Sequence, residues 1–220
     1  MTTALAAAIR AAADAVDAAR AELGRLDGAA GDGDHGMTMS IAARNVRKRL
    51  DGASEDATPA DLLRLASQAV AGVGGAIGPL YSGALAAMAA EIEASPAAAH
   101  GDVARLARAA AAAEGAIVSL GHAAPGDKTV IDALHPLVES LREAEARGVD
   151  VGAAVHAAAE AAEGGAASTA DLVARVGRAS RLGERSRGLP DAGATSFAII
   201  VRALAEAHRA SPTGGGLGGA

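Results

Sequence analysis

Cysteine and tryptophan are absent from this sequence, and Tyr81 and Phe197 are its two aromatic residues. Without cysteine the chain can form no disulfide bond, no thiolate metal site and no cysteine nucleophile. Because bulky aromatic side chains are scarce, the hydrophobic core must be built from alanine, leucine, valine and isoleucine. Such a core favours helices that pack closely together, and we therefore expect an all-α fold.

The charge pattern argues against two further classes of protein. A net charge of −6 disfavours non-specific binding to nucleic acid. Arg10 and Asp14 interrupt the N-terminal segment where a signal peptide would be continuously apolar. Residues 65–90 carry no charge and could cross a bilayer by length, but Gly78-Pro79 would break the helix. We expect a cytoplasmic protein without a nucleic-acid or membrane partner.

Apolar residues recur at three- and four-residue spacing along most of the chain, which predicts helices. No alternating run predicts a strand. Thr58 and Pro59 are typical of an N-cap and a first helical residue, and Pro136 predicts a kink or a break. The pattern predicts about eight helices, over residues 3–24, 37–50, 58–72, 78–95, 101–120, 127–147, 151–175 and 192–209.

These helices should form one domain, residues 1–210, with a glycine-rich disordered tail over residues 211–220. In an antiparallel bundle, alternate connections lie at the same end. The alternate connections are also the segments densest in glycine and polar residues. A single composite site is therefore predicted where four connections meet, namely residues 24–36, 72–83, 121–126 and 177–193.

The first of these connections carries Asp27, Asp32 and Asp34, with His35 next to them. Carboxylate oxygens in this number suit a hard cation such as Mg²⁺, which is usually shared with substrate phosphates. A solvated acidic loop that caps the next helix is the alternative. A calcium-binding EF-hand is excluded, because its twelfth loop position, counted from Asp32, is Ala43 instead of glutamate. His35 fits a phosphate donor and a structural histidine equally well.

The third connection, with Lys128 just beyond it, is similar to the sequence motif of a phosphate-binding P-loop. It departs from that motif because Asp127 precedes Lys128 and no strand leads into the segment. We instead expect Asp127 to be the N-cap of the next helix, and Lys128 to be a surface or site cation. Asp191 should cap the last helix.

The other two connections offer groups that bind anions. Backbone N–H groups of the glycine-rich second connection could hold an anion beside a helix N-terminus. Four arginines in the fourth connection suit phosphate oxygens or a nucleobase, although a solvated basic loop is the alternative. Together the four connections describe a site for a nucleotide with Mg²⁺. Charge balance between a diphosphate and three carboxylates favours two Mg²⁺ ions.

The same segments resemble the nucleotide-binding L subunit (DhaL) of dihydroxyacetone kinase. The resemblance extends over the chain to about residue 207. It is carried by four motifs in order, which are Gly31-Asp-Gly-Asp-His-Gly36, Gly74-Gly-Ala-Ile-Gly-Pro-Leu80, Pro125-Gly-Asp-Lys-Thr129 and Leu182-Gly-Glu-Arg-Ser186 with Asp191-Ala-Gly-Ala-Thr-Ser196.

The resemblance implies an antiparallel eight-helix barrel that holds ADP or ATP at one end through two Mg²⁺. It implies that Asp27, Asp32 and Asp34 are the metal ligands, and it assigns no catalytic base. The positions that it assigns to the nucleotide are His35, Gly36, Met37, Thr38, Ala76, Ile77, Gly121, Val130, Arg178, Asp191, Ala192 and Gly193. Ile77 departs from the serine common in the family, which removes a hydroxyl from the phosphate side.

The resemblance also implies partners. A K subunit would hold the ketose, and a phosphoenolpyruvate-dependent M subunit would rephosphorylate ADP that stays bound. A homodimer is compatible with the resemblance. Direct consumption of ATP, another small ketose such as a tetrulose, and a non-catalytic regulator that keeps the nucleotide site remain open alternatives.

Overall fold

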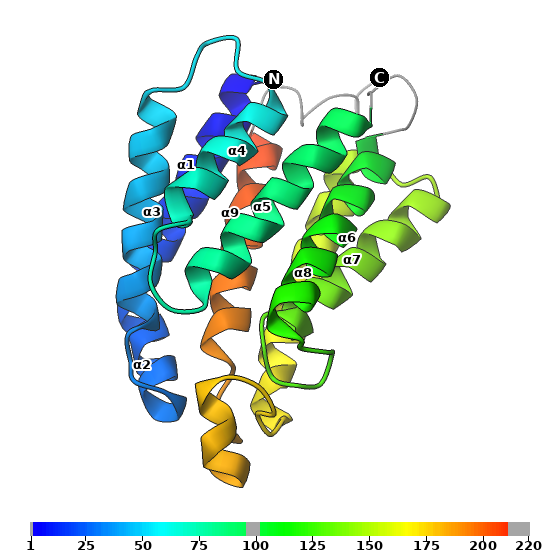
Figure 1. Cartoon of the computed structure of the whole chain (residues 1–220). Helices are drawn as coiled ribbons and strands as arrows, with labels where there is room; N and C mark the ends of the chain where they lie inside the picture. The colour runs from blue at the N-terminus through cyan, green and yellow to red at the C-terminus, as the bar shows by residue number, and fades with distance from the viewer. Residues whose placement is uncertain (1, 96–101, 211–220) are drawn as a thin grey trace.

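Nine α-helices and two short 3-10 helices make up the computed structural model, which describes residues 2–95 and 102–210 (Figure 1). No strand occurs in those two ranges, which confirms the all-α prediction. The predicted tail, residues 211–220, lies outside the described residues. The elements are α1 (Thr2–Ala18), α2 (Arg20–Ala30), α3 (His35–Asp51), α4 (Pro59–Val70), α5 (Ile77–Ala94), α6 (Asp102–Gly121), α7 (Ile131–Ala146), α8 (Val151–Ser168), η1 (Thr169–Asp171), η2 (Arg178–Ser186) and α9 (Ala192–Ala210).

The long helices alternate in direction, and their contacts form a cycle. From α3 to α9 each α-helix packs against the next one along the chain, while α1 packs against both α3 and α9. The connections before α3, α5, α7 and α9 therefore lie toward the same end, which is the lower end in Figure 1. We call this the site end of the bundle.

The core consists largely of alanine, as the composition predicts. One hydrophobic cluster is centred on α7 with Ile131, Leu134 and Val138, and a second contains Leu23 and Leu62. Helix α9 packs between the two halves of the bundle, against α1 on one side and α8 on the other (Figure 1).

Three predicted helix boundaries were wrong. The first helix does not end at Gly24, because after a break at Ala19 the chain continues as α2 to Ala30. The sixth begins at Ile131 instead of Asp127, and the seventh ends at Ser168 instead of Arg175. At Gly24 the packing of α3 against α2 overrides the local glycines. Before Ile131 the chain cannot be helical, because Lys128 has a φ of +62°. After Ser168 the chain tightens into η1, and Leu172 is extended.

The predicted start at Thr58 is confirmed. Its hydroxyl accepts a hydrogen bond from the Asp61 N–H, and the Asp61 carboxylate accepts one from the Thr58 N–H, which is a complete capping box. Pro136 lies inside α7, which runs through it as one helix from Ile131 to Ala146.

The glycine pair in α8, Gly164 and Gly165, lies inside a continuous helix, and the two residues differ in what surrounds them. A Cβ atom on Gly165 would clash with the Asp132 carbonyl oxygen of α7, whereas one on Gly164 would meet nothing within 4 Å. Gly165 therefore permits the close approach of α7 and α8.

This contrast gives a matched pair of substitutions. Gly165→Ala should lower the free energy of unfolding by about 1–3 kcal/mol, because the new methyl group must push α7 and α8 apart. Gly164→Ala should raise it by about 0.5–1 kcal/mol, because alanine is the better helix former. Urea denaturation followed by circular dichroism measures both, and equal effects of the two substitutions would contradict this account.

Candidate functional site

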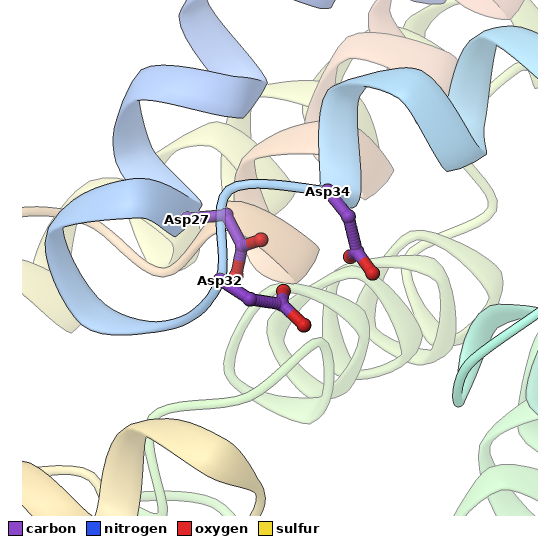
Figure 2. Close-up of side chains that lie close together, drawn as sticks. All are labelled: Asp27, Asp32 and Asp34. Carbon is purple, nitrogen blue, oxygen red and sulfur yellow. The ribbon is translucent and has the colours of Figure 1, made fainter.

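Three aspartates converge at the turn between α2 and α3, as Figure 2 shows. Asp27 lies near the end of α2, Asp32 lies in the turn, and Asp34 is the N-cap residue of α3. One carboxylate oxygen from each lies within 4.8 Å of the others. We call these three residues the acidic cluster.

The turn can be this tight because of glycine. A Cβ atom on Gly31 would lie 2.5 Å from Asp27 Oδ1, and Gly33 has a φ of +79°. A Cβ on Gly36 would clash with the Arg20 carbonyl oxygen, so glycine here also lets α3 lie against α2. The glycines in α2, which the sequence suggested as loop residues, stay helical and provide the facing surface for Gly33.

Arg178 brings positive charge to the acidic cluster from the opposite end of the sequence. Its guanidinium donates hydrogen bonds to Asp32 and to Asp34, the latter at 3.1 Å. Side chains of all three are about half exposed. Arg178 begins η2, which contacts α2, and the structure thus joins the first and fourth predicted connections.

The donor set of the acidic cluster fits a hard divalent cation. It offers carboxylate oxygens only, which is the chemistry that Mg²⁺ prefers. The repulsion among the three carboxylates is already relieved by a cationic group, the Arg178 guanidinium, and this shows that the place accepts positive charge.

His35 makes two hydrogen bonds in this structure. Its Nε2 lies 3.0 Å from Ser196 Oγ of α9, and its backbone N–H donates to Asp27 Oδ2 at 3.1 Å. Burial lowers the pKa of His35 below its ordinary value, against the opposing effect of the Asp27 and Asp34 carboxylates. The imidazole is therefore neutral at pH 7 and links α3 to α9.

Two helices that begin at the site end, α3 and α5, lack the side-chain caps that α4 and α8 have at the other end. At the other end, Thr58 caps α4 and Asp150 caps α8 with side-chain hydrogen bonds. At the site end, the N-cap residues of α3 and α5, Asp34 and Ala76, make no side-chain cap. The His35 N–H already donates to Asp27 Oδ2, but the other N–H groups in the first turns of α3 and α5 have no side-chain cap and could meet an anion, with the helix dipoles favouring negative charge.

Most of the predicted nucleotide-contacting residues lie at helix ends. Gly36 to Thr38 form the first turn of α3, Ala76 and Ile77 begin α5, and Ala192 and Gly193 begin α9. Gly121 ends α6.

The side chains of Ile77 and Val130 are buried in the hydrophobic core. Ile77 therefore contributes an apolar side chain to the core and offers no hydroxyl to a phosphate.

The glycine-rich turn before α5 leaves open space. A Cβ atom on Gly72, Gly74 or Gly75 would meet nothing within 4 Å. Met37, in contrast, is 45% exposed and lines a hollow beside α2 with Arg20 and Gly24. That hollow contains none of the acidic cluster.

Two expectations for the third connection were wrong. Asp127 does not cap α7, because its carboxylate accepts a hydrogen bond from the Ala124 N–H and α7 begins at Ile131. Lys128 is neither a surface nor a site cation, since it is 3% exposed and donates to three backbone carbonyls. Asp132 instead organises this turn by accepting from the N–H groups of Gly126 and Thr129.

Asp191 caps α9, as predicted, by accepting a hydrogen bond from the Ala194 N–H at 2.8 Å. Burial raises the pKa of this carboxyl group to about 6, although the backbone N–H groups and the Lys128 charge act in the opposite direction.

Sequence reasoning missed the contacts that two residues make near the site, Ser196 and Asp132. It also missed that Lys128 is buried. Ser196 ends the motif that begins at Asp191, but a serine in a helix gives no sign of the distant residue that it contacts. Lys128 does carry a signal, since the sequence has only one other lysine, Lys48, and uses arginine for every other permanent cation.

Residues 29–206 match the DAK2 domain family. The chain belongs to this family. It is also 36% identical over 184 residues to the ADP-binding subunit DhaL of the PEP-dependent dihydroxyacetone kinase of Escherichia coli, a match that covers 84% of this chain and 86% of that subunit. The resemblance inferred from the four motifs is confirmed.

Other relatives are longer proteins. The chain is 40% identical over 217 residues to the D-erythrulose kinase of Mycolicibacterium smegmatis, covering 96% of this chain but 36% of that kinase. The crystal structure of the dihydroxyacetone kinase of C. freundii in complex with AMP-PNP and Mg²⁺ is similar with a TM-score of 0.66 and 28% identity, covering 91% of this chain and 33% of that one. The chain thus spans about a third of the length of these two proteins.

Removing one carboxylate of the acidic cluster tests its role. Asp32→Asn should weaken Mg²⁺-dependent binding of ADP about tenfold or more, because one anionic ligand is lost. Asp51→Asn is the matched control, since Asp51 is also exposed and paired with an arginine, Arg10, but lies at the end of α3 remote from the cluster. Calorimetric titration of ADP with and without Mg²⁺ measures both, and equal effects would identify the cluster as a surface loop.

The buried carboxyl group of Asp191 predicts a pH dependence of stability. Its folded-state pKa of about 6 exceeds the ordinary 3.8, so the folded state binds the proton more tightly and loses stability as pH rises between these values. Asp191→Asn removes the ionisation and still caps the helix. The variant should therefore gain stability relative to the parent between pH 4 and pH 7, by roughly 3 kcal/mol at most.

Urea denaturation across that pH range measures the difference, with Asp150→Asn at the N-cap of α8 as the control for replacing a capping aspartate. A difference between Asp191→Asn and the parent that does not change with pH would show that the carboxyl group is not destabilised by burial.

Proposed function

We propose that this chain is the nucleotide-binding part of a dihydroxyacetone-type kinase, a phosphotransferase that passes a phosphoryl group to a small ketose held by a K-type partner. The observation that carries the proposal is the convergence of three carboxylates, within 4.8 Å, at the end of the bundle where α3, α5, α7 and α9 begin. Family membership and the named activities of the relatives support the same reaction class.

Asp27, Asp32 and Asp34 would hold Mg²⁺, two ions by the charge argument above. Bound magnesium neutralises charge on the nucleotide phosphates and on the phosphoryl group in transfer. The first turns of α3 and α5 would supply backbone N–H groups to phosphate oxygens. Arg178, already within reach of the cluster, would supply a planar donor for the same oxygens.

No side chain in this arrangement has to act as a base. The neutral His35 is held against Ser196, and the carboxylates are placed to bind cations. The residues of this chain would therefore act by positioning and charge compensation, which is how phosphoryl transfer is catalysed in general.

The proposal allows more than one ketose and more than one phosphoryl donor, and the relatives favour particular candidates for each. Relatives at 40% and 42% identity are named D-erythrulose kinase and L-erythrulose 1-kinase, which favours a tetrulose as a second candidate acceptor. The E. coli relative is named as the subunit of a PEP-dependent enzyme, which favours bound ADP as a cofactor recharged by an M-type partner.

Reconstitution with K-type partners tests the proposal. With Mg²⁺ and a K-type subunit, the chain should transfer phosphate from ATP, or from phosphoenolpyruvate when an M-type system is added, to dihydroxyacetone or erythrulose. ADP that co-purifies and resists dialysis would identify the phosphoenolpyruvate route, whereas readily exchanged nucleotide would identify direct use of ATP. Tight binding of ADP with Mg²⁺ but no transfer with any K-type partner would instead establish a non-catalytic nucleotide-binding module.

A further inference from the structure

A buried lysine lies at the base of the segment that carries Arg178. We call this segment, residues 172–189, the arginine loop; it leaves the bundle after η1 and returns just before α9. The Lys128 ammonium donates to the carbonyl oxygens of Thr169 at 2.7 Å and Leu172 at 3.3 Å, where the arginine loop begins. It also donates to the Leu189 carbonyl oxygen at 2.7 Å, where the loop ends.

The three bonds use all the donors that an ammonium group has. Lys128 is 3% exposed, and therefore has no free N–H to offer a phosphate. Asp191 and Asp171 face it with negative charge and Arg187 with positive charge, while burial lowers its pKa. Three converging carbonyl oxygens match a compact ammonium better than a planar guanidinium.

The backbone conformation of Lys128 gives independent support. Its φ is +62°, in the left-handed region where glycine fits without strain and other residues cost roughly 1 kcal/mol or more. A long side chain persists at this strained position in a chain that has only one other lysine. The contacts of the ammonium group offset the strain of its backbone.

Further hydrogen bonds join the two ends of the loop beside Lys128. The Arg187 guanidinium donates to the Asp171 carbonyl oxygen at 2.7 Å, and the Ala174 N–H donates to Ser186 Oγ at 2.9 Å. The Gly188 N–H donates to the Ala170 carbonyl oxygen at 2.8 Å, and the Arg175 N–H donates to the Asp127 carbonyl oxygen at 3.1 Å. These last two bonds lie near the ends of the arginine loop, and the second is accepted by Asp127, the residue that precedes Lys128. Arg178 reaches the acidic cluster from the far side of the base of the loop.

We propose that Lys128 is a positioning residue which closes the base of the arginine loop and so fixes where Arg178 meets the acidic cluster and its ligand. Lys128 acts on the nucleotide only through Arg178. The statement about the ligand rests on the proposed function, whereas the closure of the loop does not.

Binding measurements test the link between the two residues. Lys128→Met should weaken binding of ADP with Mg²⁺ about tenfold, whereas Lys48→Met, at the other and exposed lysine, should leave it unchanged. In an Arg178→Met background, Lys128→Met should cause almost no further loss, because the residue that it positions is gone. Losses that add in the double variant would overturn the proposal.

Limited trypsin digestion tests the loop without any nucleotide. The arginine loop contains five arginines, Arg175, Arg178, Arg181, Arg185 and Arg187. Cleavage there should be several-fold faster in Lys128→Met than in the parent or in Lys48→Met, at a temperature where circular dichroism shows all three folded. Unchanged cleavage would contradict the closure.

A second variant covers the case in which Lys128→Met does not fold. Lys128→Arg keeps the charge and most donors and should show smaller losses, with the same absence of further loss when Arg178 is replaced. If the parent protein does not bind ADP with Mg²⁺, the proposed function fails, and the digestion still decides whether Lys128 closes the loop.

Discussion

The repulsion among three carboxylates is the constraint on which the site end of this protein depends. Asp27, Asp32 and Asp34 repel one another because one carboxylate oxygen of each lies within 4.8 Å of the others, and a cation between or beside them relieves that repulsion. In this conformation the compensation comes from Arg178, which the sequence places 144 residues beyond Asp34. The charge of the cluster therefore couples the first hairpin of the fold to its last connection, and a divalent cation that binds there must compete with, or act beside, this guanidinium.

Glycine supplies the geometry that the charges need. At Gly31 and Gly36 a side chain would collide with Asp27 or with the backbone of α2, whereas at Gly72 and Gly74 a side chain would meet only open space. The first pair serves packing of the α2–α3 turn. The second pair leaves room above the start of α5, where a bound molecule could approach the backbone closely.

Composition and periodicity sufficed to predict the helical class, the ends of most helices and the end of the bundle where the acidic cluster and Arg178 meet. In an antiparallel bundle every second connection lies at the same end, wherever the exact helix boundaries fall. This rule alone predicted that the connections of Arg178 and Asp32 lie at one end. Boundaries themselves failed at Gly24, Asp127 and Arg175, where local residue type was a poor guide. The α2 glycines stay helical because α3 packs on them. A short stretch of sequence around each glycine does not contain the residues that make this contact.

The sequence also misled about Lys128 and left His35 undecided for a common reason. Both are polar residues next to the site whose role depends on what buries them, and burial is a property of distant segments. Thr169 and Leu189 surround Lys128, and Ser196 lies against His35. The motif that contains each residue cannot reveal these neighbours, which lie between 41 and 161 positions away.

Among the described helices, no segment is long and apolar enough to cross a membrane. The uncharged stretch is divided between α4, which ends at Val70, and α5, which begins at Ile77; the break lies just before Gly78-Pro79.

The separation of the connections between two ends of the bundle has a further consequence for evolution. The turns at residues 52–58 and 147–150 join helices at the end remote from the acidic cluster, and they are held by local caps at Thr58 and Asp150. Insertions there would lengthen the protein without disturbing the carboxylates or Arg178. The fold can therefore acquire new surfaces at one end while its chemistry stays fixed at the other.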